Sequence, residues 1–306
     1  MLLAALGLPT LVAAAVARAA RPEPLEVAEV APGIFVHAGL HELADEGNLG
    51  AIANVGFVIG GDAVAVIDSG GCAEGGRRLR QAIRARTDLP IRYVIATHVH
   101  PDHIFGHAAF LSDAPAFVGH AKLPAALAAR GSYYQGRLAD ELGAQADGSE
   151  VVPPDLLVEE RLELDLGGRL LELEAHRTAH TDNDLTVFDR ASGTLWLADL
   201  LFMERCPSLD GSLLGWLGVL DRLARRQVAR VVPGHGPVRA PWPQAAAPEL
   251  RYLGLLRDQI RMLQTEGGTI EQAVTEVAWG EEKAWRLFDV YHPRNVTAAF
   301  AELEWE

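Results

Sequence analysis

The sequence of 306 residues predicts an α/β fold of four layers, an αββα sandwich in which helices cover the outer faces of two packed sheets. Two observations predict it. Strand-like runs joined by glycine-containing turns fall into two groups along the chain, and helical segments follow each group. The composition, 49% hydrophobic and 22% charged, is typical of a globular chain, and the length is sufficient for a sizeable core.

The first group of strands begins with short β-like runs within residues 25–38. Residues 55–59 and 63–67 are largely apolar and rich in β-branched side chains, and the Gly-Gly-Asp turn between them predicts a hairpin. Asp68 follows directly at the end of the second strand of this hairpin.

Apolar residues at helical spacing predict a helix over residues 74–86, with arginines on its other face. Residues 91–96 form a short, largely apolar strand that leads straight into a histidine-rich loop. A second helix is expected over residues 123–130, and the polar stretch of residues 131–148 that follows it shows no clear pattern.

The second group of strands consists of short aliphatic segments at residues 162–166, 170–173, 185–188, 194–198 and 228–232. The fourth of these strands ends at Asp199. From Ala247 onward, an apolar stripe at helical spacing predicts helices. We therefore expect one main domain over residues 25–240 and a helical C-terminal extension, residues 241–306, packed on the same domain.

The N-terminal segment is typical of a signal peptide. Residues 2–16 are nearly all apolar, and the small-x-small pattern Ala17-Arg18-Ala19 follows them. This predicts a signal peptide over residues 1–19 and a periplasmic or secreted protein without a stable membrane span after cleavage. The segment lacks a basic residue before its apolar run, so an uncleaved anchor or a misplaced start codon is the alternative.

Charge and cysteine content limit the classes of partner and site. The formal net charge is −14 and the basic residues are scattered, so the chain offers no positive stripe for nucleic acid, and a small-molecule substrate is expected. Cys72 and Cys206 are too few for a cysteine-built zinc site. A disulfide between them and two unrelated buried thiols are both open.

A cluster of ionisable side chains follows the strand at residues 91–96. The segment from Thr97 to His103 holds three imidazoles and one carboxylate, and burying them at a strand end costs free energy unless a cation is present. His98 and His100 can chelate one ion, and Asp102 and His103 can face a second. Neutral imidazole and carboxylate are the usual ligands of catalytic zinc.

Three further candidates lie at the ends or edges of later segments: His180, Asp199 and His235, the last within Pro-Gly-His-Gly. Each alone is weak evidence, because a single loop histidine is more often a surface residue. Together, and in this order after the first cluster, they form a specific set.

The set resembles the metallo-β-lactamase superfamily, whose motifs are His-x-His-x-Asp-His, a later His, a later Asp and a final Gly-His. The resemblance covers about residues 35–235. It implies the four-layer αββα sandwich of the metallo-β-lactamase type and a metal-dependent hydrolase with two zinc ions as cofactors. It assigns the first zinc to His98, His100 and His180, the second to Asp102, His103 and His235, and a bridging role to Asp199.

Two other features follow from the same resemblance. Asp68 resembles the family's buried aspartate behind the metal loop, which orients a ligand histidine by a hydrogen bond. Ala179 and Ala198 depart from the family pattern, because glycine usually precedes the third histidine and the bridging aspartate. A bridging aspartate resembles glyoxalase II and is lacking in true β-lactamases, which weighs against antibiotic hydrolysis without deciding it.

A narrower resemblance is to the quinoprotein relay system zinc metallohydrolases. Residues 48–57 (Asn-Leu-Gly-Ala-Ile-Ala-Asn-Val-Gly-Phe) and residues 179–185 (Ala-His-Thr-Asp-Asn-Asp-Leu) carry it. It implies an exported accessory of periplasmic pyrroloquinoline-quinone-dependent alcohol oxidation, with a quinoprotein dehydrogenase system as candidate partner.

The expected chemistry is hydrolysis of an ester, thioester or amide-type bond by a hydroxide shared between two zinc ions about 3.5–4 Å apart. Asp102 is the candidate catalytic residue among the ligands. One alternative is a mononuclear iron enzyme similar to persulfide dioxygenases, which would use His98, His180 and Asp199. A metallo-β-lactamase proper and a non-catalytic accessory binding protein are the others.

The substrate mouth is expected to form from residues 48–57 and the helical tail, with the polar loop of residues 42–50 as a flap, because coordination geometry constrains the metal loops themselves. Tyr133 and Tyr134 are expected in the core rather than at the substrate.

Overall fold

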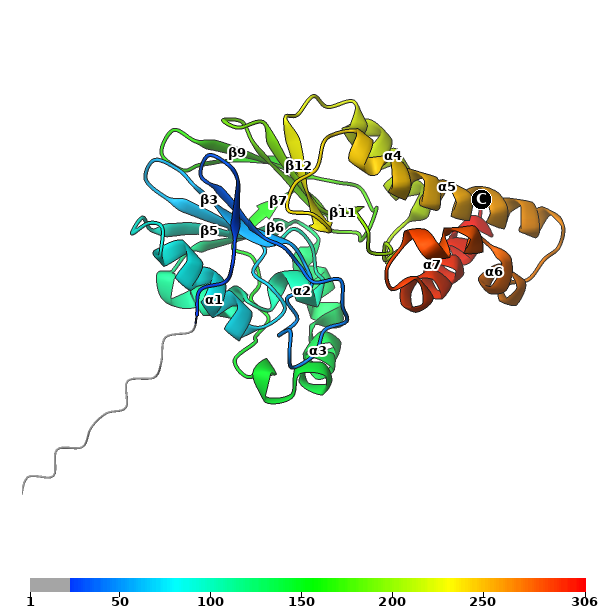
Figure 1. Ribbon diagram of the computed structural model, residues 1–306, viewed down its shortest axis with the longest axis horizontal. Coiled ribbons are helices and arrows are strands. Elements are labelled where there is room, and N and C mark those ends of the chain that lie inside the picture. Colours follow the sequence, from blue (N-terminus) through cyan, green and yellow to red (C-terminus); the bar gives the residue numbers. More distant parts are fainter. Residues whose placement is uncertain (1–22) are drawn as a thin grey trace, which may run out of the picture.

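The computed structural model describes residues 23–306, and two β-sheets lie between two groups of helices (Figure 1). The predicted signal peptide over residues 1–19 lies outside the described residues. Within residues 23–306, every helix is either too short or too polar to cross a bilayer.

The first sheet has seven strands in sequence order, antiparallel from β1 to β4 and parallel from β4 to β7. The strands are β1 (Ala28–Ala31), β2 (Ile34–His37), β3 (Val55–Ile59), β4 (Val64–Ile67), β5 (Ile91–Ile95), β6 (Ala116–His120) and β7 (Leu156–Val158). The predicted hairpin at residues 55–67 is therefore confirmed as β3 and β4. Both strands are almost fully buried, since they lie at the centre of the sheet.

The second sheet has five strands in the spatial order β12-β11-β10-β9-β8, and only the β11-β12 pair is parallel. The strands are β8 (Arg161–Asp165), β9 (Leu170–Ala175), β10 (Leu185–Asp189), β11 (Thr194–Phe202) and β12 (Arg230–His235). All nine residues of β11 are buried, which is expected for a strand that is covered on both faces.

The two sheets pack face to face through aliphatic side chains. Val36 and Ile67 of the first sheet lie in the same core cluster as Leu173, Val187 and Trp196 of the second. The outer face of the first sheet packs against α1, and the outer face of the second packs against the later helices. The predicted four-layer αββα sandwich is therefore confirmed.

The helices on the side of the first sheet are α1 (Ala73–Arg84), α2 (Pro101–Ile104) and α3 (Leu123–Leu142), with short 3-10 turns at His107–Asp113 and Gly143–Ala146. The predicted helix over residues 74–86 corresponds to α1. The Sγ atom of Cys72 accepts the Gly75 N–H at the N-terminus of α1.

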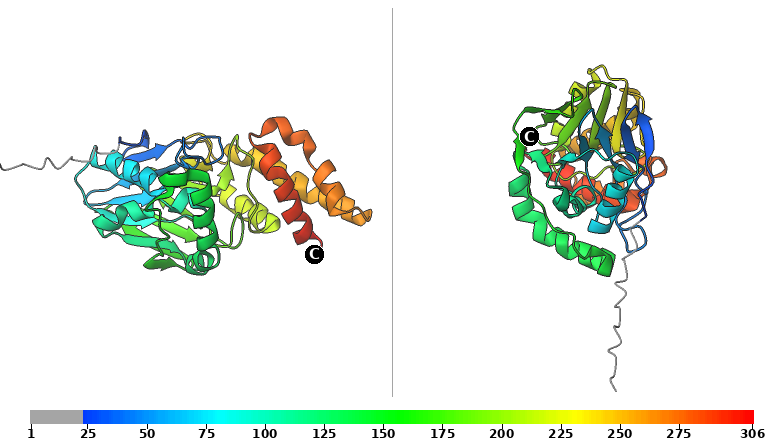
Figure 2. Two further views of the ribbon diagram at one scale, coloured as in Figure 1. Left: turned by 90° about the horizontal axis from the view of Figure 1, so that it is seen from below. Right: turned by 90° about the vertical axis from the view of Figure 1, so that its left-hand side faces the viewer.

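The helices beyond the second sheet are α4 (Leu213–Ala224), α5 (Ala247–Thr265), α6 (Ile270–Glu276) and α7 (Phe288–Leu303), with 3-10 turns at Gln244–Ala246 and Trp279–Ala284. Figure 2 shows α5, α6 and α7, in orange to red, at the end of the molecule away from β1. Leu253 and Leu256 of α5 share one core cluster with Leu195 and Leu197 of β11, so the helical tail packs on the second sheet.

Two sequence expectations differ from the structure. Helix α3 continues to Leu142 and does not end near Arg130, because Leu138 and Leu142 extend its buried face. Gly131, Gly136 and the polar residues around them obscure this face in the sequence. Strand β11 continues past Asp199 to Phe202, with irregular register around Ala198. Asp199 therefore lies within a strand and not at its end.

The two cysteines are both free and buried. The Sγ atom of Cys206 lies against the Tyr252 hydroxyl and the Asn295 amide. Burial raises the pKa of the Cys206 thiol to about 12, so it stays protonated and behaves as a packing residue.

Candidate metal centre

The histidine-rich loop begins directly after β5 and ends in α2. His100 is the N-cap residue of α2, and Pro101 starts the helix with its fixed φ angle. Asp102 and His103 therefore lie on the first helical turn, while His98, in a bend, and His100, in extended backbone, precede it. The local sequence thus separates two pairs of candidate ligands along one short segment.

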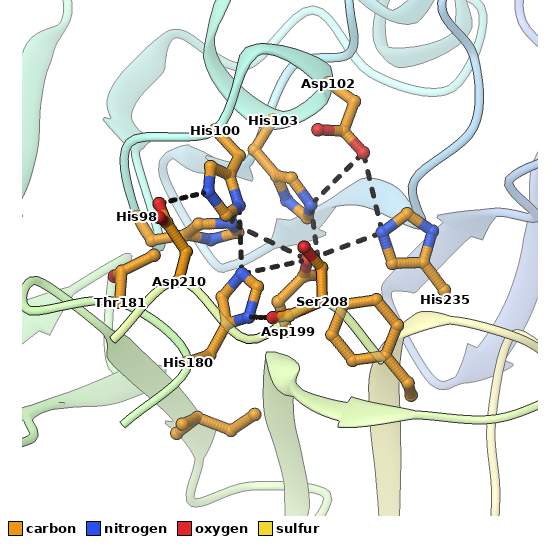
Figure 3. A network of polar contacts seen from close by, with 12 residues as sticks. His98, His100, Asp102, His103, His180, Thr181, Asp199, Ser208, Asp210 and His235 are labelled. Carbon is orange, nitrogen blue, oxygen red and sulfur yellow. Dashed lines mark hydrogen bonds and ion pairs between the residues drawn. The ribbon is translucent and has the colours of Figure 1, made fainter. Parts of the chain in front are cut away.

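The first group of side chains consists of His98, His100, His180 and Asp199, each contributing one atom within 4.8 Å of the others. The Nδ1 atom of His100 lies 3.0 Å from Nε2 of His98 and 2.9 Å from Nε2 of His180. Figure 3 shows these three rings converging on one point, although His180 comes from a loop far along the chain. Three ring nitrogens so close together suit a shared cation.

The second group consists of Asp102, His103 and His235. The Nε2 atoms of His103 and His235 lie 3.8 and 3.5 Å from Oδ2 of Asp102. Asp199 lies between the two groups: its Oδ1 is 3.1 Å from His103 Nε2, and its Oδ2 is 3.4 Å from both His180 Nε2 and His235 Nε2. All seven residues predicted as ligands are therefore brought together.

Asp68 holds the second group from behind. This fully buried carboxylate accepts hydrogen bonds from the backbone and hydroxyl of Thr97 and from Nδ1 of His103, each at 2.8 Å. The bond fixes the His103 ring so that Nε2 faces the centre. This is the geometry that the predicted orienting role of Asp68 requires.

Backbone carbonyls orient two other rings. His180 Nδ1 donates to the carbonyl of Ser208 at 2.7 Å, and His235 Nδ1 donates to the carbonyl of Ile52 at 2.7 Å. Each bond leaves Nε2 as the atom that faces the centre.

The His100 ring is oriented from the cleft side. Its Nε2 atom lies 3.1 Å from Oδ2 of Asp210, and Arg130 forms an ion pair with the same carboxylate oxygen. Burial alone would raise the pKa of Asp210, but the hydrogen bond with His100 and the charge of Arg130 lower it to about 2. An ionised Asp210 therefore keeps Nδ1 of His100 free to act as a ligand.

His98, His180 and Asp199 are in the protonation states that bind metals. Burial lowers the pKa of His98 well below its ordinary value, with a smaller contribution from His103, and burial lowers the pKa of His180 to about 3. Burial alone would raise the pKa of Asp199, but the imidazoles of His103 and His235 hold it well below its usual range. His103 differs from these two rings: burial alone would lower its pKa, but the carboxylates of Asp199, Asp68 and Asp102 hold it well above the ordinary value, so this ring would release its proton on binding a metal.

Two buried atoms show that the centre fits a metal. His103 Nε2 and Asp199 Oδ1 lie 3.1 Å apart without forming a well-aligned hydrogen bond, and neither atom has another hydrogen-bond partner among the described residues. Buried polar atoms without partners are rare and cost free energy. Both belong to the seven-residue set, and a cation held between the two groups would give each of them a partner. The donor set of imidazole nitrogens and carboxylate oxygens matches the preference of zinc.

The backbone at Ala198 explains one departure from the family pattern. Ala198 has a φ of 46°, in the left-handed region that glycine adopts most easily. The strain turns the chain so that the next residue, Asp199, enters the centre from within β11. Ala179 is buried, but its φ is not positive, so alanine replaces the usual glycine there without backbone strain.

Three adjoining cavities of about 540, 350 and 140 Å³ open onto the centre. The smallest is lined by Asp102, Asp199 and His235 of the centre. The walls of the larger two come from α3, α7, the loop near Leu43 and Ile52, and the segment around Ser208. The predicted mouth is thus present in part, and α3 is a wall that the sequence did not indicate.

The last helix also anchors the segment that holds His180. The Asn295 side chain of α7 accepts the Leu209 N–H at 2.9 Å and donates to the Pro207 carbonyl at 2.7 Å, on either side of Ser208. The orientation of a candidate ligand therefore depends on the C-terminal helix.

Several cleft residues were not found from the sequence. Tyr133 is 62% exposed and lines the largest of the three cavities, so the expectation that it lies in the core was wrong. Tyr134 lines the same cavity but is half-buried and packs against core residues, so the expectation is met in part there. They lie on the part of α3 that the sequence did not predict. Asp210 and Arg205 line the cleft as well, and no spacing to the metal motifs marks either of them.

Comparisons with known proteins agree with this geometry. Residues 50–235 match the sequence profile of the Metallo-beta-lactamase superfamily. A comparison with curated proteins gives no match. A solved metallo-beta-lactamase from Pontibacter korlensis is similar with a TM-score of 0.60 at 20% identity, over 75% of this chain and 99% of that one. A metallo-beta-lactamase from Hirschia baltica gives 0.55 at 17% identity, over 71% and 93%.

A stereoselective inverting sec-alkylsulfatase, Pisa1 from Pseudomonas sp., gives a TM-score of 0.65 at 19% identity and covers 90% of this chain. The chain spans 49% of the length of that protein. At these identities, the structural likeness shows the shared fold alone.

Proposed function

The chain belongs to the metallo-β-lactamase superfamily, and we propose that it is a hydrolase that uses two zinc ions to cleave an ester, thioester or amide-type bond. One observation carries the dinuclear proposal: Asp199 lies between both groups of ligands, within 3.1 Å of His103 and 3.4 Å of His180. A carboxylate in this position can bind two ions at once. The family membership and the two His/Asp groups both support a metal-dependent hydrolase.

In this proposal the ligands are those that the motifs predicted. His98, His100 and His180 would hold the first ion, Asp102, His103 and His235 the second, and Asp199 would contact both. Zinc ions in such a site lower the pKa of a bound water and polarise a substrate oxygen. The chain's own contribution is to orient the rings through Asp68, Asp210 and two backbone carbonyls.

Asp102 is the ligand best placed to meet the substrate as well. Its side chain is 17% exposed, and it lines two of the three cavities. Burial alone would raise the pKa of Asp102, but the His103 and His235 imidazoles lower it, so the carboxylate is ionised. We therefore assign Asp102 the catalytic role, as a charged group that lines the cleft.

The alternatives make different demands on the same residues. A mononuclear iron enzyme would need only His98, His180 and Asp199. It would leave His103 Nε2, which is buried and has no hydrogen-bond partner among the described residues, without a function. A metallo-β-lactamase proper is disfavoured by the bridging position of Asp199. A non-catalytic accessory protein would not need three cavities that open onto the ligands.

Metal analysis tests the proposal. Protein purified without chelators should contain close to two zinc ions per chain by mass spectrometry, and one iron with no zinc would contradict the dinuclear hydrolase. His235→Ala should reduce the content to about one ion, whereas His37→Ala, outside both groups, should retain two. Activity should be screened on acyl esters, thioesters, amides, a β-lactam and a secondary alkyl sulfate.

We further propose that the protein is exported and serves a quinone-dependent alcohol oxidation system, with the dehydrogenase as candidate partner. The support is the apolar N-terminal segment and the motifs at residues 48–57 and 179–185. Sequencing the mature N-terminus from fractionated cells should give a periplasmic or secreted chain that begins near Ala20. A full-length chain in the cytoplasm would contradict this proposal.

A further inference from the structure

Arg205 lies buried next to the metal ligands without an acidic partner. The residue is 3% exposed, and in residues 23–306 its guanidinium forms no ion pair. Its Nη1 donates to the Glu42 carbonyl at 2.8 Å, its Nη2 donates to the Tyr291 hydroxyl at 2.5 Å, and the guanidinium carbon lies 5.1 Å from the centre of the Tyr291 ring. Burying a charge that no opposite charge compensates is costly.

The position of Arg205 links this charge to the reaction centre. It lines the same cavity of about 140 Å³ as Asp102, Asp199 and His235. Tyr291 lines this cavity too and supplies a hydroxyl beside the guanidinium. A substrate atom that reaches the ligands through this cavity would therefore also come close to Arg205 and Tyr291.

The other arginines of the cleft differ in whether they are paired. Arg130 forms an ion pair with Asp210, and Arg137 forms one with Glu141. Arg294, on α7 at the border of the two larger cavities, is exposed and has no ion pair among residues 23–306. Arg205 and Arg294 thus provide two uncompensated positive charges in one cleft of a protein whose formal net charge is −14.

We propose that Arg205, assisted by Tyr291, binds an anionic group of the substrate next to the bond that is cleaved, and that Arg294 attracts such substrates into the cleft. The inference rests on the proposed hydrolase function and names its substrate class: molecules that carry a carboxylate or a sulfate. The planar guanidinium group of arginine suits both a carboxylate and a sulfate, because it can donate two parallel hydrogen bonds to two oxygen atoms of either group.

Binding of simple anions tests the site without relying on turnover. Succinate and sulfate should be titrated calorimetrically into the zinc-containing protein at constant ionic strength. At least one of them should bind the wild type about tenfold or more tightly than it binds Arg205→Met, the factor expected for one lost charge-assisted hydrogen bond. The anion that binds more tightly identifies the substrate group as a carboxylate or a sulfate.

Kinetics provide the second measurement. The wild type should prefer p-nitrophenyl hydrogen succinate to the neutral p-nitrophenyl butyrate, and Arg205→Met should reduce this ratio of kcat/KM values about tenfold or more. Arg225→Met directly after α4, which removes an exposed arginine outside the three cavities, is the matched control and should keep the wild-type ratio. Arg294→Met should lower the ratio less and mainly weaken its dependence on salt.

The outcomes separate the two proposals. Anion binding that depends on Arg205, in a protein that cleaves no ester, thioester or amide of the panel, would overturn the hydrolase function and leave the anion site standing. Equal anion binding and equal charge preference in the wild type and Arg205→Met would overturn the anion site. Arg205→Lys keeps the positive charge but cannot donate two parallel hydrogen bonds. Its anion affinity and charge preference should therefore lie between those of the wild type and Arg205→Met, which provides a test even if Arg205→Met folds poorly.

Discussion

A methyl group on the α carbon of Gly234 would lie 1.9 Å from Oδ1 of Asp199. The two residues lie on the paired strands β12 and β11. No side chain larger than hydrogen fits between Gly234 and the carboxylate that contacts both groups of ligands. The glycine of the Gly-His motif therefore sets the position of Asp199 as well as that of His235.

Gly234→Ala should displace the Asp199 carboxylate and reduce the metal content from two ions to fewer than one per chain. The reason is steric, since the neighbouring backbone of Ala198 and Asp199 also lies within 2.7 Å of the added atom. Metal analysis and circular dichroism would measure the result. Gly254→Ala on α5, where an added methyl meets no atom within 4 Å, should keep both ions. Full metal content in Gly234→Ala would contradict the prediction.

Ala198→Gly should cost less stability than an ordinary substitution of a buried strand alanine. Glycine relieves the strain at a φ of 46°, which amounts to about 1–2 kcal/mol for an L-residue. Ala65→Gly in β4 is the matched control, because Ala65 is equally buried and its φ is not positive. Urea unfolding should show Ala198→Gly to be more stable than Ala65→Gly by about 1 kcal/mol. Equal losses would show that the backbone at Ala198 is unstrained.

Asp210→Asn should weaken metal binding about 10- to 100-fold while the protein stays folded. The substitution removes the charge that holds the His100 ring at 3.1 Å and leaves Arg130 without its partner. A competition titration with a chromophoric chelator would measure the affinity. Asp221→Asn, which removes an exposed carboxylate of α4, should bind metal like the wild type. Wild-type affinity in Asp210→Asn would show that the His100 contact is incidental.

Glu249→Gln should remove a pH dependence of stability. Glu249 on α5 is fully buried; its Oε1 accepts the Phe202 N–H at 3.1 Å, and its Oε2 has no partner among the described residues. Burial raises the pKa of Glu249 well above its usual value. The folded protein then keeps a proton that the unfolded chain has lost. The contribution to stability is complete below the unfolded pKa and is lost as pH rises through the folded pKa.

The wild type should therefore lose about 1.4 kcal/mol of unfolding free energy per pH unit relative to Glu249→Gln, from about pH 5 up to the folded pKa. Urea titrations in the presence of a chelator at several pH values would measure the difference, without a contribution from metal release. The exposed Glu266→Gln should keep the wild-type slope. Parallel curves for Glu249→Gln and the wild type would show that Glu249 is ionised in the folded protein.

The ligands could be predicted from the sequence because metal chemistry restricts both residue type and spacing. The four ligands between His98 and His103 lie within six residues, directly after one predicted strand. The hairpin that ends at Asp68 is marked by its Gly-Gly-Asp turn. The structure brings the later ligands His180, Asp199 and His235 to the same place. Their order along the chain, compared with the family motifs, was sufficient to select them.

The walls of the cleft could not be predicted in the same way. Helix α3 has Gly131 and Gly136 in its interior and a weak apolar face, so its second half resembled a loop and the exposed Tyr133 was misplaced. Arg205 and Tyr291 meet because the segment after β11 pairs with the segment before α7 through the bridge between Arg205 and Arg286, and no local pattern reports such a contact. Residues that act through tertiary contacts leave no signature in sequence spacing.

The contact of Asn295 with the segment around Ser208 has a consequence for the biogenesis of the protein. His180 takes its orientation from the Ser208 carbonyl, and this segment is held by a helix close to the end of the chain. A nascent chain that lacks α7 already contains every ligand but lacks the contact that fixes one of them. We therefore expect metal uptake to follow completion of the polypeptide, so that chains stalled before Asn295 acquire the first ion slowly and release it readily.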